Sequence, residues 1–530
     1  MSLLLVLNRP SSALNRARTV VTVLLLCLLS VSRVEALNAI ELKLRNSNKV
    51  VVKLMFRNGA ISDPAGKEGL TYTTASLMVE GAAGGRSYSA IRDQLYPWAA
   101  VYGASVDKEV TVFTFEVPAE FADPFYPILR DVILNPGFEE NDFKRIKANQ
   151  QNYVDQVIRA SSDETYSKLA LEDLLFRGKN YQHMTQGKSA SVQSITRDDV
   201  KNHYKKFFTR NNLTLGIAGH FSPAFLRRLK EDLAKLPDTE PDFPKPGAPN
   251  KPNGVEVEII AKAGAFGSAI FTGAPLSITR ADDEFAALMV ANSWMGEHRK
   301  AYSRLYQKLR ETRAMNYGDY SYIEWYADGG SNQLPPSGVP RHSNYSSIWI
   351  RPVQIAAQLK QQYGELAGIQ LGHAHFALRM ALREFDLLLK KGMSEEDFQA
   401  TRVFLRSYSK LYAQSPADQL GWLMDSRFYG RSNYLKELDK LLRRLKLEDV
   451  NAALRRHWQT DNLYVTIVTD VSEAEPLAKN LRENLPSPMS YSNLVKSGLS
   501  KEVLDEDEVV ARYKLNVKSV RIVPSAETFK

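Results

Sequence analysis

One short pattern occurs twice in this chain: residues 138–143 read FEENDF, and residues 393–398 read MSEEDF. Each stretch opens a helical pattern, the first of which runs through residues 144–157. Acidic side chains in the first turn of a helix are stabilised by the positive end of the helix dipole. Both stretches therefore predict the start of a helix.

A second pair of similar stretches follows the first. Residues 211–215 read NNLTL, residues 461–465 read DNLYV, and each leads into a predicted strand. Counted from the last phenylalanine of the acidic stretch to the first leucine of the strand, the separations are 70 and 65 residues. Two matches in the same order and at similar spacing predict a duplicated domain.

The boundary between the two copies lies at residues 237–254, PDTEPDFPKPGAPNKPNG. Proline fixes φ and removes a backbone donor, so the six prolines of this stretch exclude a helix or a central strand and predict a semi-stiff linker. We expect an N-terminal domain over residues 37–236, a C-terminal domain over residues 255–487 and a tail over residues 488–530.

The elements predicted inside the copies are of both kinds. Residues 50–56 and 110–117 are typical of strands, because they are rich in β-branched and aromatic side chains. Helices are predicted over residues 69–79, 87–95, 124–134 and 163–176. This mixture predicts an α+β fold of two homologous domains, each a mostly antiparallel sheet packed with helices.

The first 36 residues have the layout of a secretory signal peptide. Three arginines and no acidic residue precede an apolar run at residues 20–31, and Val34-Glu35-Ala36 fits a cleavage site. The run is shorter than the roughly 20 residues of a membrane span. We expect export to the periplasm and no membrane attachment after cleavage. A mitochondrial presequence is the alternative, whereas bulky leucines before Cys27 disfavour a lipid anchor.

Composition excludes other classes of protein. Removal of residues 1–36 would take away four arginines and one glutamate, which lowers the formal net charge from +9 to +6, and would also remove the only cysteine. The remaining chain would have no thiol or disulfide chemistry. Its basic residues form no stripe interleaved with aromatic ones, so we expect no binding to nucleic acid.

Five stretches carry a resemblance to one family of proteins. They are residues 69–78 (GLTYTTASLM), 135–138 (NPGF), 195–219, 303–317 (SRLYQKLRETRAMNY) and 504–524. In their order and spacing they resemble the pitrilysin/insulinase family of zinc metalloproteases, which includes processing peptidases. The resemblance covers nearly the whole chain after residue 36.

The zinc motif of that family is missing from the matching helix. Family members carry H-x-x-E-H, in which two histidines bind zinc and the glutamate is the general base for the zinc-bound water. The matching positions here are Tyr72, Ala75 and Ser76. Hydroxyl groups do not replace two imidazoles as zinc ligands at ordinary affinity. We therefore expect no metal and no cofactor in this chain.

The sequence offers no replacement zinc site. No two of the eight histidines stand four apart with an acid between them, and His373 and His375, two apart, point to different faces of a helix. The family's third ligand is a glutamate some 75 residues after the motif. Glu164 and Glu172 lie in the helix interpreted as its equivalent, and without histidine partners both are interpreted as solvent-facing acids.

A second functional element of the family is retained. Active members carry an arginine and a tyrosine, seven residues apart, in the half that lacks zinc, and these match Arg310 and Tyr317. The resemblance implies that the tyrosine stabilises the oxyanion and that the arginine holds the substrate backbone at the partner's zinc. Taken singly, the two residues also fit a surface helix residue and a packed strand residue. The loss of the zinc motif favours the functional interpretation.

Other family features are matched more weakly. Substrate peptides of the family add a strand to a sheet edge, and the matching segment, residues 103–108, is interpreted as a loop and the start of a strand. Arg304 and Arg313 are interpreted as charges on a helix surface.

These observations predict a non-catalytic subunit. We expect the chain to pair with an H-x-x-E-H subunit of the same family, to bind a peptide or unfolded protein, and to supply Arg310 and Tyr317 to zinc held by that partner. The alternative is a peptide-binding or scaffold homodimer without a protease role, since the same fold also serves as structural subunits. A hydrolase with other catalytic residues has no G-x-S-x-G motif to support it.

Overall fold

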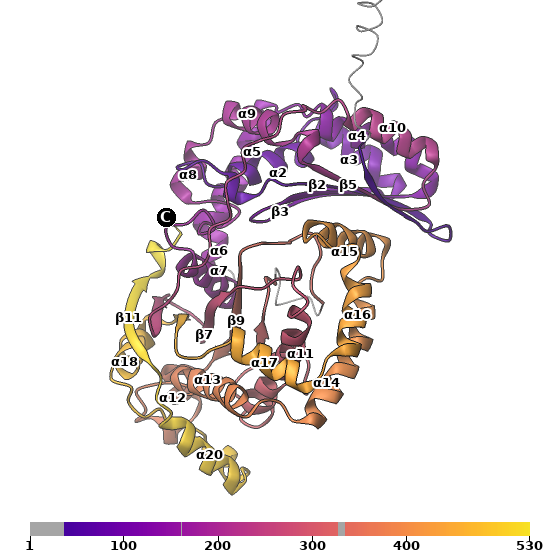
Figure 1. Ribbon diagram of the computed structural model, residues 1–530. Helices are drawn as coiled ribbons and strands as arrows, with labels where there is room; N and C mark the ends of the chain where they lie inside the picture. Colours follow the sequence, from indigo (N-terminus) through magenta and orange to yellow (C-terminus); the bar gives the residue numbers. More distant parts are fainter. Residues whose placement is uncertain (1–36, 161, 327–333, 530) are drawn as a thin grey trace, which may run out of the picture.

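The computed structural model describes residues 37–160, 162–326 and 334–529. It contains two open sheets, each packed with helices (Figure 1), which confirms the predicted α+β class. The segment interpreted as a signal peptide, residues 1–36 with Cys27, lies outside the described residues. Among the described helices, none has the length and apolar character needed to cross a membrane.

The first sheet has five strands in the order β1-β5-β2-β4-β3. They are β1 (Ala39–Lys43), β2 (Lys49–Phe56), β3 (Val101–Val106), β4 (Thr111–Pro118) and β5 (Leu213–Gly219). β1 runs parallel to β5, and the other neighbours are antiparallel. The two strands predicted in this half are β2 and β4, with Val52 opposite Phe115 of β4 and Ile217 of β5.

The second sheet has six strands in the order β11-β6-β10-β7-β9-β8. They are β6 (Val255–Ala261), β7 (Ser268–Leu276), β8 (Asp319–Tyr322), β9 (Asn344–Val353), β10 (Leu463–Thr469) and β11 (Val517–Pro524). β6 is parallel to both β10 and β11, and the remaining neighbours are antiparallel. Without β11, the order and directions repeat those of the first sheet strand for strand. The predicted duplication is therefore present in the topology.

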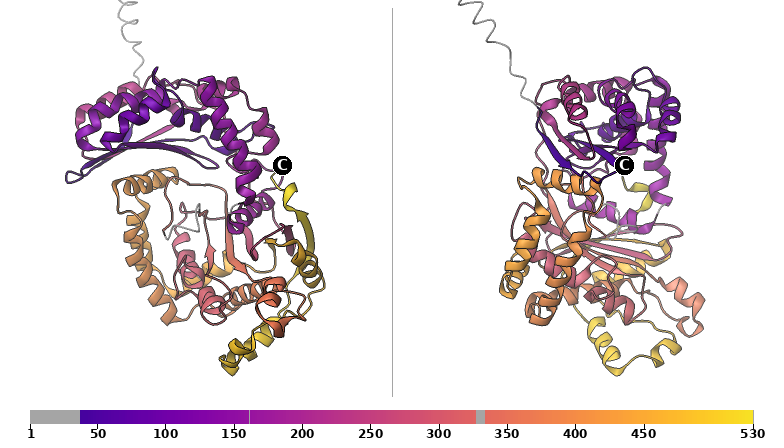
Figure 2. Two further views of the ribbon diagram at one scale, coloured as in Figure 1. Left: turned by 180° about the vertical axis from the view of Figure 1, so that it is seen from behind. Right: turned by 90° about the vertical axis from the view of Figure 1, so that its right-hand side faces the viewer.

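Helices of the first half cover one face of the first sheet (Figures 1 and 2). They are α2 (Leu70–Glu80), α3 (Tyr88–Leu95), α4 (Ala122–Leu134), α5 (Glu140–Asn152), α8 (Ser189–Ser194), α9 (Arg197–Phe207) and α10 (Pro223–Leu233). After α5 the chain continues through a π-helical segment, η4 (Tyr153–Val157), into α6 (Ile158–Ala160) and α7 (Asp163–Leu175). The helices predicted in this half are α2, α3, α4 and α7.

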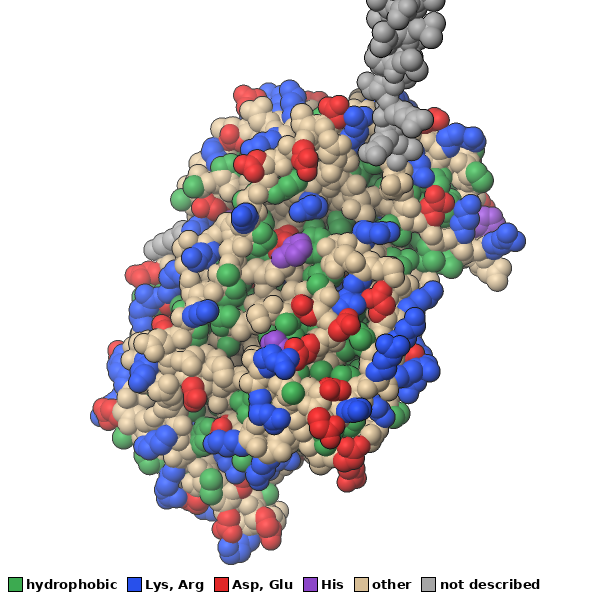
Figure 3. All heavy atoms as spheres, viewed as in Figure 1, with side chains coloured by type: hydrophobic (Ala, Val, Ile, Leu, Met, Phe, Trp, Pro, Cys, Tyr) green, Lys and Arg blue, Asp and Glu red, His purple; other side chains and the backbone are tan. Residues whose placement is uncertain are grey.

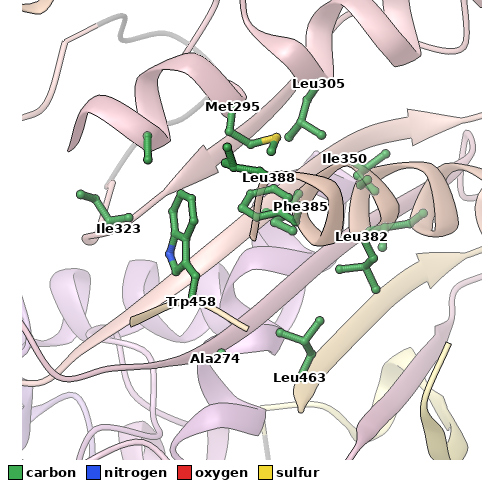
Figure 4. Packing of buried hydrophobic residues seen from close by; sticks show 14 of the residues in the cluster. Ala274, Met295, Leu305, Ile323, Ile350, Leu382, Phe385, Leu388, Trp458 and Leu463 are labelled. Atoms are coloured by element: carbon green, nitrogen blue, oxygen red, sulfur yellow. The ribbon is translucent and has the colours of Figure 1, made fainter. Parts of the chain in front are cut away.

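The second half has a larger set of helices. They are α11 (Phe285–Gly296), the π-helical segment η6 (Tyr306–Glu311), α12 (Ala356–Gln362), α13 (Ala374–Lys391), α14 (Glu395–Tyr408), α15 (Pro416–Phe428), α16 (Tyr434–Arg444), α17 (Leu447–His457), α18 (Val471–Arg482), α19 (Asn493–Ser497) and α20 (Lys501–Ala511). Figure 4 shows the core between α11, α13 and the sheet, in which the rings of Phe385 and Trp458 meet edge to face with centroids 5.1 Å apart.

Each half contributes one helix to the sheet of the other half. α7 packs on β7 and β10 of the second sheet, where Leu171 lies against Gly273. α15 packs on β2 and β5 of the first sheet, where Leu420 and Met424 lie against Gly216, and Figure 1 shows it beneath that sheet. The two helices hold equivalent places after the acidic helices α5 and α14, so the exchange is reciprocal.

The proline-rich linker forms no helix or strand over residues 237–252. It lies against the end of α7, where the Asn250 N–H donates to the Leu175 carbonyl at 2.8 Å and the Gly247 N–H donates to Asn180 Oδ1 at 2.9 Å. The linker is thus docked on the body of the protein over part of its length.

Candidate functional site

Helix α2 presents the altered zinc motif along one half-exposed stripe. Tyr72, Ser76 and Glu80 stand four residues apart, and they are the half-buried positions of a helix whose other residues are buried. Burial raises the pKa of Tyr72, and a hydrogen bond with Ser76 opposes that shift. Ala75, at the position of the family's general base, is 0 % exposed. The stripe has the spacing of the zinc helix and none of its ligands.

A buried network fixes the start of α2. The Asp63 carboxylate accepts hydrogen bonds from the N–H groups of Gly69 and Thr71, both at 2.7 Å. The Thr71 hydroxyl also donates to Asp63 at 2.6 Å and lies 3.1 Å from Nε2 of His203. Burial lowers the pKa of His203 to about 4, so its imidazole is neutral at ordinary pH. These groups position the helix from its buried end.

The structure adds Tyr153 to this site, a residue that sequence reasoning missed. Burial raises the pKa of Tyr153, with a smaller contribution from the nearby phenol of Tyr72. Tyr153 opens η4 and follows Ser76 by 77 residues, close to the 75-residue spacing of the family's third ligand. That spacing, counted from Ser76, was the signal that could have found it.

The interpretation of Glu164 and Glu172 as solvent-facing acids in the equivalent helix was wrong. Glu172 is 2 % exposed, and its carboxylate pairs with Lys108 Nζ at 3.1 Å and with Arg341 Nη1 at 2.5 Å. Glu164 accepts a hydrogen bond from Arg351 Nε at 2.8 Å. Because Arg341 and Arg351 belong to the second half, both acids join the two halves.

The site does not fit zinc. Tyr72, Ala75, Ser76 and Tyr153 offer two phenols, a methyl group and one hydroxyl, with no imidazole or carboxylate among them. Within the described ranges, no three His, Cys, Asp or Glu side chains are grouped so that they could hold a metal ion.

An edge of the first sheet runs beside this stripe. β3 is the outer strand next to β4, and α2 packs against it. A groove of about 490 Å³ lies alongside, and its lining includes Val79, Tyr88, Arg92, Tyr96 and Tyr102. The segment 103–108 had been interpreted as a loop and strand start, which was wrong because residues 103–106 are the end of β3 and Lys108 is 1 % exposed.

Arg310 and Tyr317 are brought together in the second half. Arg310 Nη1 donates to the carbonyl of Tyr317 at 3.1 Å, and its guanidinium lies 4.8 Å from the ring centroid of Tyr306. The Tyr317 residue is 75 % exposed and precedes β8, so it is not a packed strand residue. Its phenol is available to groups outside this chain. In the duplicated topology β8 is the equivalent of the edge strand β3.

The interpretation of Arg304 and Arg313 as helix-surface charges was wrong. Arg313 is 2 % exposed, and its guanidinium donates to Asp507 Oδ1 at 2.7 Å and to Glu506 Oε2 at 2.8 Å. Arg304 Nε donates to Glu384 Oε2 at 2.6 Å. The acids that pair with Arg313 come from the tail, almost 200 residues away, where no local pattern could reveal them.

Comparison with known proteins agrees with this architecture. Residues 40–180 match the family described as Insulinase (Peptidase family M16), and residues 194–335 match the one described as Peptidase M16 inactive domain. The protein named non-peptidase homolog YmxG from Helicobacter pylori is 21% identical over 429 residues, which cover 79% of this chain and 88% of that protein.

Solved structures share the fold. The peptidase M16 inactive domain from Pseudomonas fluorescens has a TM-score of 0.68 at 18% identity, covering 82% of this chain and 95% of that one. The periplasmic protease PqqL from Escherichia coli has a TM-score of 0.61 at 13% identity, covering 91% of this chain and 50% of that one.

The two family matches span a little over half of the chain, one in each of the regions where the sequence resemblance was found. The repeated sheets, the helix at the position of the zinc motif and the arginine–tyrosine pair lie in the order that the family requires. The chain therefore belongs to the insulinase family of peptidases, family M16.

Proposed function

We propose that this protein is a non-catalytic subunit of a zinc metalloendopeptidase and pairs with an H-x-x-E-H subunit of its own family. The observation that carries the proposal is the asymmetry between its halves. The first half has no zinc ligand at Tyr72, Ala75, Ser76 and Tyr153, whereas the second half presents Arg310 beside an exposed Tyr317. The name non-peptidase homolog, given to the Helicobacter pylori relative, supports the lack of activity in a lone chain.

Tyr317 and Arg310 would act on a substrate held at the partner's zinc. The metal, bound by the partner, supplies an activated water and polarises the scissile carbonyl. The exposed Tyr317 phenol would donate a hydrogen bond to the oxyanion as negative charge develops there. Arg310 Nη1 now donates to the carbonyl of Tyr317, and a substrate carbonyl would extend or replace that contact and so fix the register of the peptide.

The substrate class supported best is an extended peptide or an unfolded protein. β3 and β8 are outer strands at equivalent ends of the two sheets, and outer strands can pair with an added strand. The groove beside β3 would then receive side chains of the added segment.

The compartment we propose is the periplasm, with cleavage after residue 36. The layout of residues 1–36 supports it, as does the printed title of PqqL, a periplasmic protease of the same fold. Cell fractionation with N-terminal sequencing of the mature chain tests this. A mature N-terminus near residue 37 in the periplasmic fraction supports export, whereas recovery from mitochondria contradicts it.

Replacement of Tyr317 by phenylalanine tests the proposed role in catalysis. In the complex with an H-x-x-E-H partner, Tyr317→Phe should lower kcat by about ten- to a thousandfold, because one oxyanion donor is lost. Tyr302→Phe is the matched control, since it removes a partly exposed hydroxyl from the same half away from Arg310. An unchanged kcat for Tyr317→Phe would remove this residue from the mechanism.

A peptide-holding scaffold, perhaps formed by two copies of this chain, is the second candidate function. It is favoured by the groove at β3, which lies beside a helix without zinc ligands. Fluorescence anisotropy with a labelled unfolded peptide separates the two functions. Tight binding by the lone chain, together with no cleavage by any complex with an H-x-x-E-H partner, would favour the scaffold.

A further inference from the structure

The C-terminal tail, residues 488–529, makes an excursion that is fixed at its base by one buried arginine. Arg379 of α13 is 0 % exposed. Its guanidinium donates to Ser487 Oγ at 2.8 Å, to the Ala511 carbonyl at 2.5 Å and to Asn484 Oδ1 at 3.0 Å. Ser487 and Ala511 lie at the two ends of the segment that carries α19 and α20, so one side chain holds both ends.

From this base, α20 reaches across to η6, the segment that carries Arg310. Glu506 of α20 pairs with Lys308 Nζ at 2.7 Å and with Arg313 Nη2 at 2.8 Å. Asp507 pairs with Arg313 Nε at 2.7 Å. Lys308 and Arg313 lie on either side of Arg310 in the sequence. The acidic pair of the tail therefore holds η6 both before and after the residue expected to bind substrate.

The contacts are buried enough to favour one arrangement. The Arg313 side chain is 0 % exposed and that of Lys308 is 19 % exposed. Burial alone would raise the pKa of Glu506, but Lys308 and Arg313 lower it to about 2, so the carboxylate is charged at ordinary pH. A buried guanidinium without its carboxylates would be an uncompensated charge, which is strongly unfavourable. Undocking of α20 is therefore opposed.

The backbone of η6 has a form that such contacts can select. Its turn is wide, and the Thr312 N–H donates to the Gln307 carbonyl at 3.0 Å, five residues back. Arg313 Nη1 donates to the Lys308 carbonyl at 2.8 Å within the same turn. π-helical turns are rare and occur frequently at functional sites. The equivalent helix in the first half, α3, is a regular α-helix.

We propose that α20 is a positioning element for the substrate-binding pair. Glu506 and Asp507 hold Lys308 and Arg313, these fix the π-helical turn of η6, and the turn sets the position of Arg310 and of the segment that ends at Tyr317. Glu506 and Asp507 are positioning residues, since they act through η6. The consequence for catalysis rests on the proposed function, whereas the consequence for the position of η6 does not.

A distance measurement tests the structural part without any assay of activity. The only cysteine is Cys27, so a Cys27→Ser chain accepts spin labels at two chosen sites, Ala314→Cys after η6 and Lys391→Cys at the exposed end of α13. In the Glu506→Gln/Asp507→Asn variant we expect the distance between the two labels to shift or its distribution to broaden. A distribution that matches the parent chain would overturn the proposal.

Two further variants keep the test sound. Glu502→Gln/Glu508→Gln is the matched control, because it removes two exposed charges from the same helix, and its distance distribution should match the parent. Where the double variant at 506 and 507 does not fold by circular dichroism, Glu506→Gln alone leaves the Asp507–Arg313 pair in place and should still broaden the distribution. Glu506→Asp keeps the charge and should restore much of the parent distribution.

Kinetics of the complex with the zinc-binding partner test the functional part. Glu506→Gln/Asp507→Asn should lower kcat/KM by about tenfold, whereas Glu506→Asp should recover most of it. An unchanged kcat/KM, in a complex whose kcat falls with Tyr317→Phe, would contradict the positioning role. If Tyr317→Phe itself has no effect, the proposed function fails, and the label distances still decide whether α20 positions η6.

Discussion

Tyr72 and Ser76 lie four residues apart on the half-exposed stripe of α2, and Tyr153 completes their group from η4. At the scale of single residues the chain has kept the scaffold of a zinc site and changed its ligands. The buried contacts of Asp63 with Gly69 and Thr71 still fix the start of the helix. The loss is therefore chemical, and the backbone around it remains ordered.

Zinc ligands restored on this scaffold should bind metal. The variant Tyr72→His/Ser76→His/Tyr153→Glu would place two imidazoles and a carboxylate where the family holds zinc, and we expect it to bind one Zn²⁺ per chain. Tyr72→His/Ser76→His is the control and should bind Zn²⁺ more weakly, because it has one ligand fewer. Isothermal titration calorimetry measures both. Equal affinities would show that Tyr153 is not the third position.

Asp319, two residues after Tyr317, should make stability depend on pH. It is 0 % exposed, and burial raises its pKa from 3.8 to about 8. The folded state thus favours the protonated acid. Its contribution to stability is full below pH 4 and is lost as pH rises toward 8. Asp319→Asn should remove on the order of 3 kcal/mol of that loss, since one pKa unit corresponds to about 1.4 kcal/mol.

Urea unfolding at several pH values measures this effect. Asp319→Asn should match the parent chain near pH 4 and exceed its stability near pH 8. Glu311→Gln, an exposed change in the neighbouring helix, is the control and should follow the parent at every pH. A parallel pH dependence in parent and Asp319→Asn would rule out a raised pKa.

Residues of the site could be predicted where they belong to a local motif. Tyr72, Ala75 and Ser76 were found from one helix, and Arg310 with Tyr317 from one segment of seven residues. Tyr153 was missed because its place depends on how η4 folds back on α2. The burial of Arg313 was missed for a related reason, since its partners come from the tail.

At the scale of elements, the reciprocal exchange of α7 and α15 is what joins the halves. Gly216 and Gly273 are the strand positions where the exchanged helices approach most closely, and a Cβ at Gly216 would lie 2.7 Å from Met424 Sδ. Glu172 of α7 and Asp425 of α15 hold the same position in the two helices and are both buried. The two copies therefore repeat their contacts as well as their topology.

Truncation of a side chain on α15 should weaken a sheet that lies far from it in sequence. Leu420 is 0 % exposed and packs with Val51 and Met55 of β2. Leu420→Ala should cost about 2–5 kcal/mol, the range for a leucine removed from a core. Hydrogen exchange should become faster in β2 and β5 of the first half. Val403→Ala, at an exposed site on α14, should change neither quantity.

The end of the tail should contribute to the stability of the first half. Phe529 is 7 % exposed and meets the ring of Tyr166 edge to face at 5.3 Å, while Arg159 Nη2 donates to the Thr528 carbonyl at 2.7 Å. Phe529→Ala should lower the free energy of unfolding by about 1–3 kcal/mol, because an apolar contact of this size is lost. Thermal unfolding measures it, with the exposed change Glu527→Gln as control.

The elements themselves were predictable, and their exchange was not. β2, β4, β5 and β10, and the helices α2, α3, α4 and α7, follow from local periodicity and capping residues. The sequence of α7 is apolar enough to cover a sheet, but nothing in it says which sheet. Likewise, the linker marks the order of the copies along the chain, whereas α7 and α15 cross that boundary in space.

At the scale of the whole molecule, the two halves form one unit. Arg341 pairs with Asp107 and Glu172 at 2.5–2.7 Å, which ties the second half to a loop and a helix of the first. Charges of both signs are mixed over the face shown in Figure 3, and no basic stripe is visible there. That face offers no feature typical of a nucleic-acid surface.

The halves should not fold separately. Residues 37–236 alone would leave the first sheet without α15, and residues 255–530 alone would leave the second sheet without α7. We expect each fragment to lack a cooperative thermal transition, and the two fragments expressed together to recover one. Differential scanning calorimetry decides this, and a cooperative transition in either fragment alone would contradict the joined architecture.

The central claim is that this chain completes an active site whose zinc lies in another subunit. The most direct measurement isolates the chain from its native compartment with its partner and determines zinc content and peptide cleavage for each separated chain and for the complex. We expect zinc in the partner alone, and cleavage by the complex that depends on Arg310 and Tyr317. Chelator-sensitive cleavage by this chain on its own would contradict the claim.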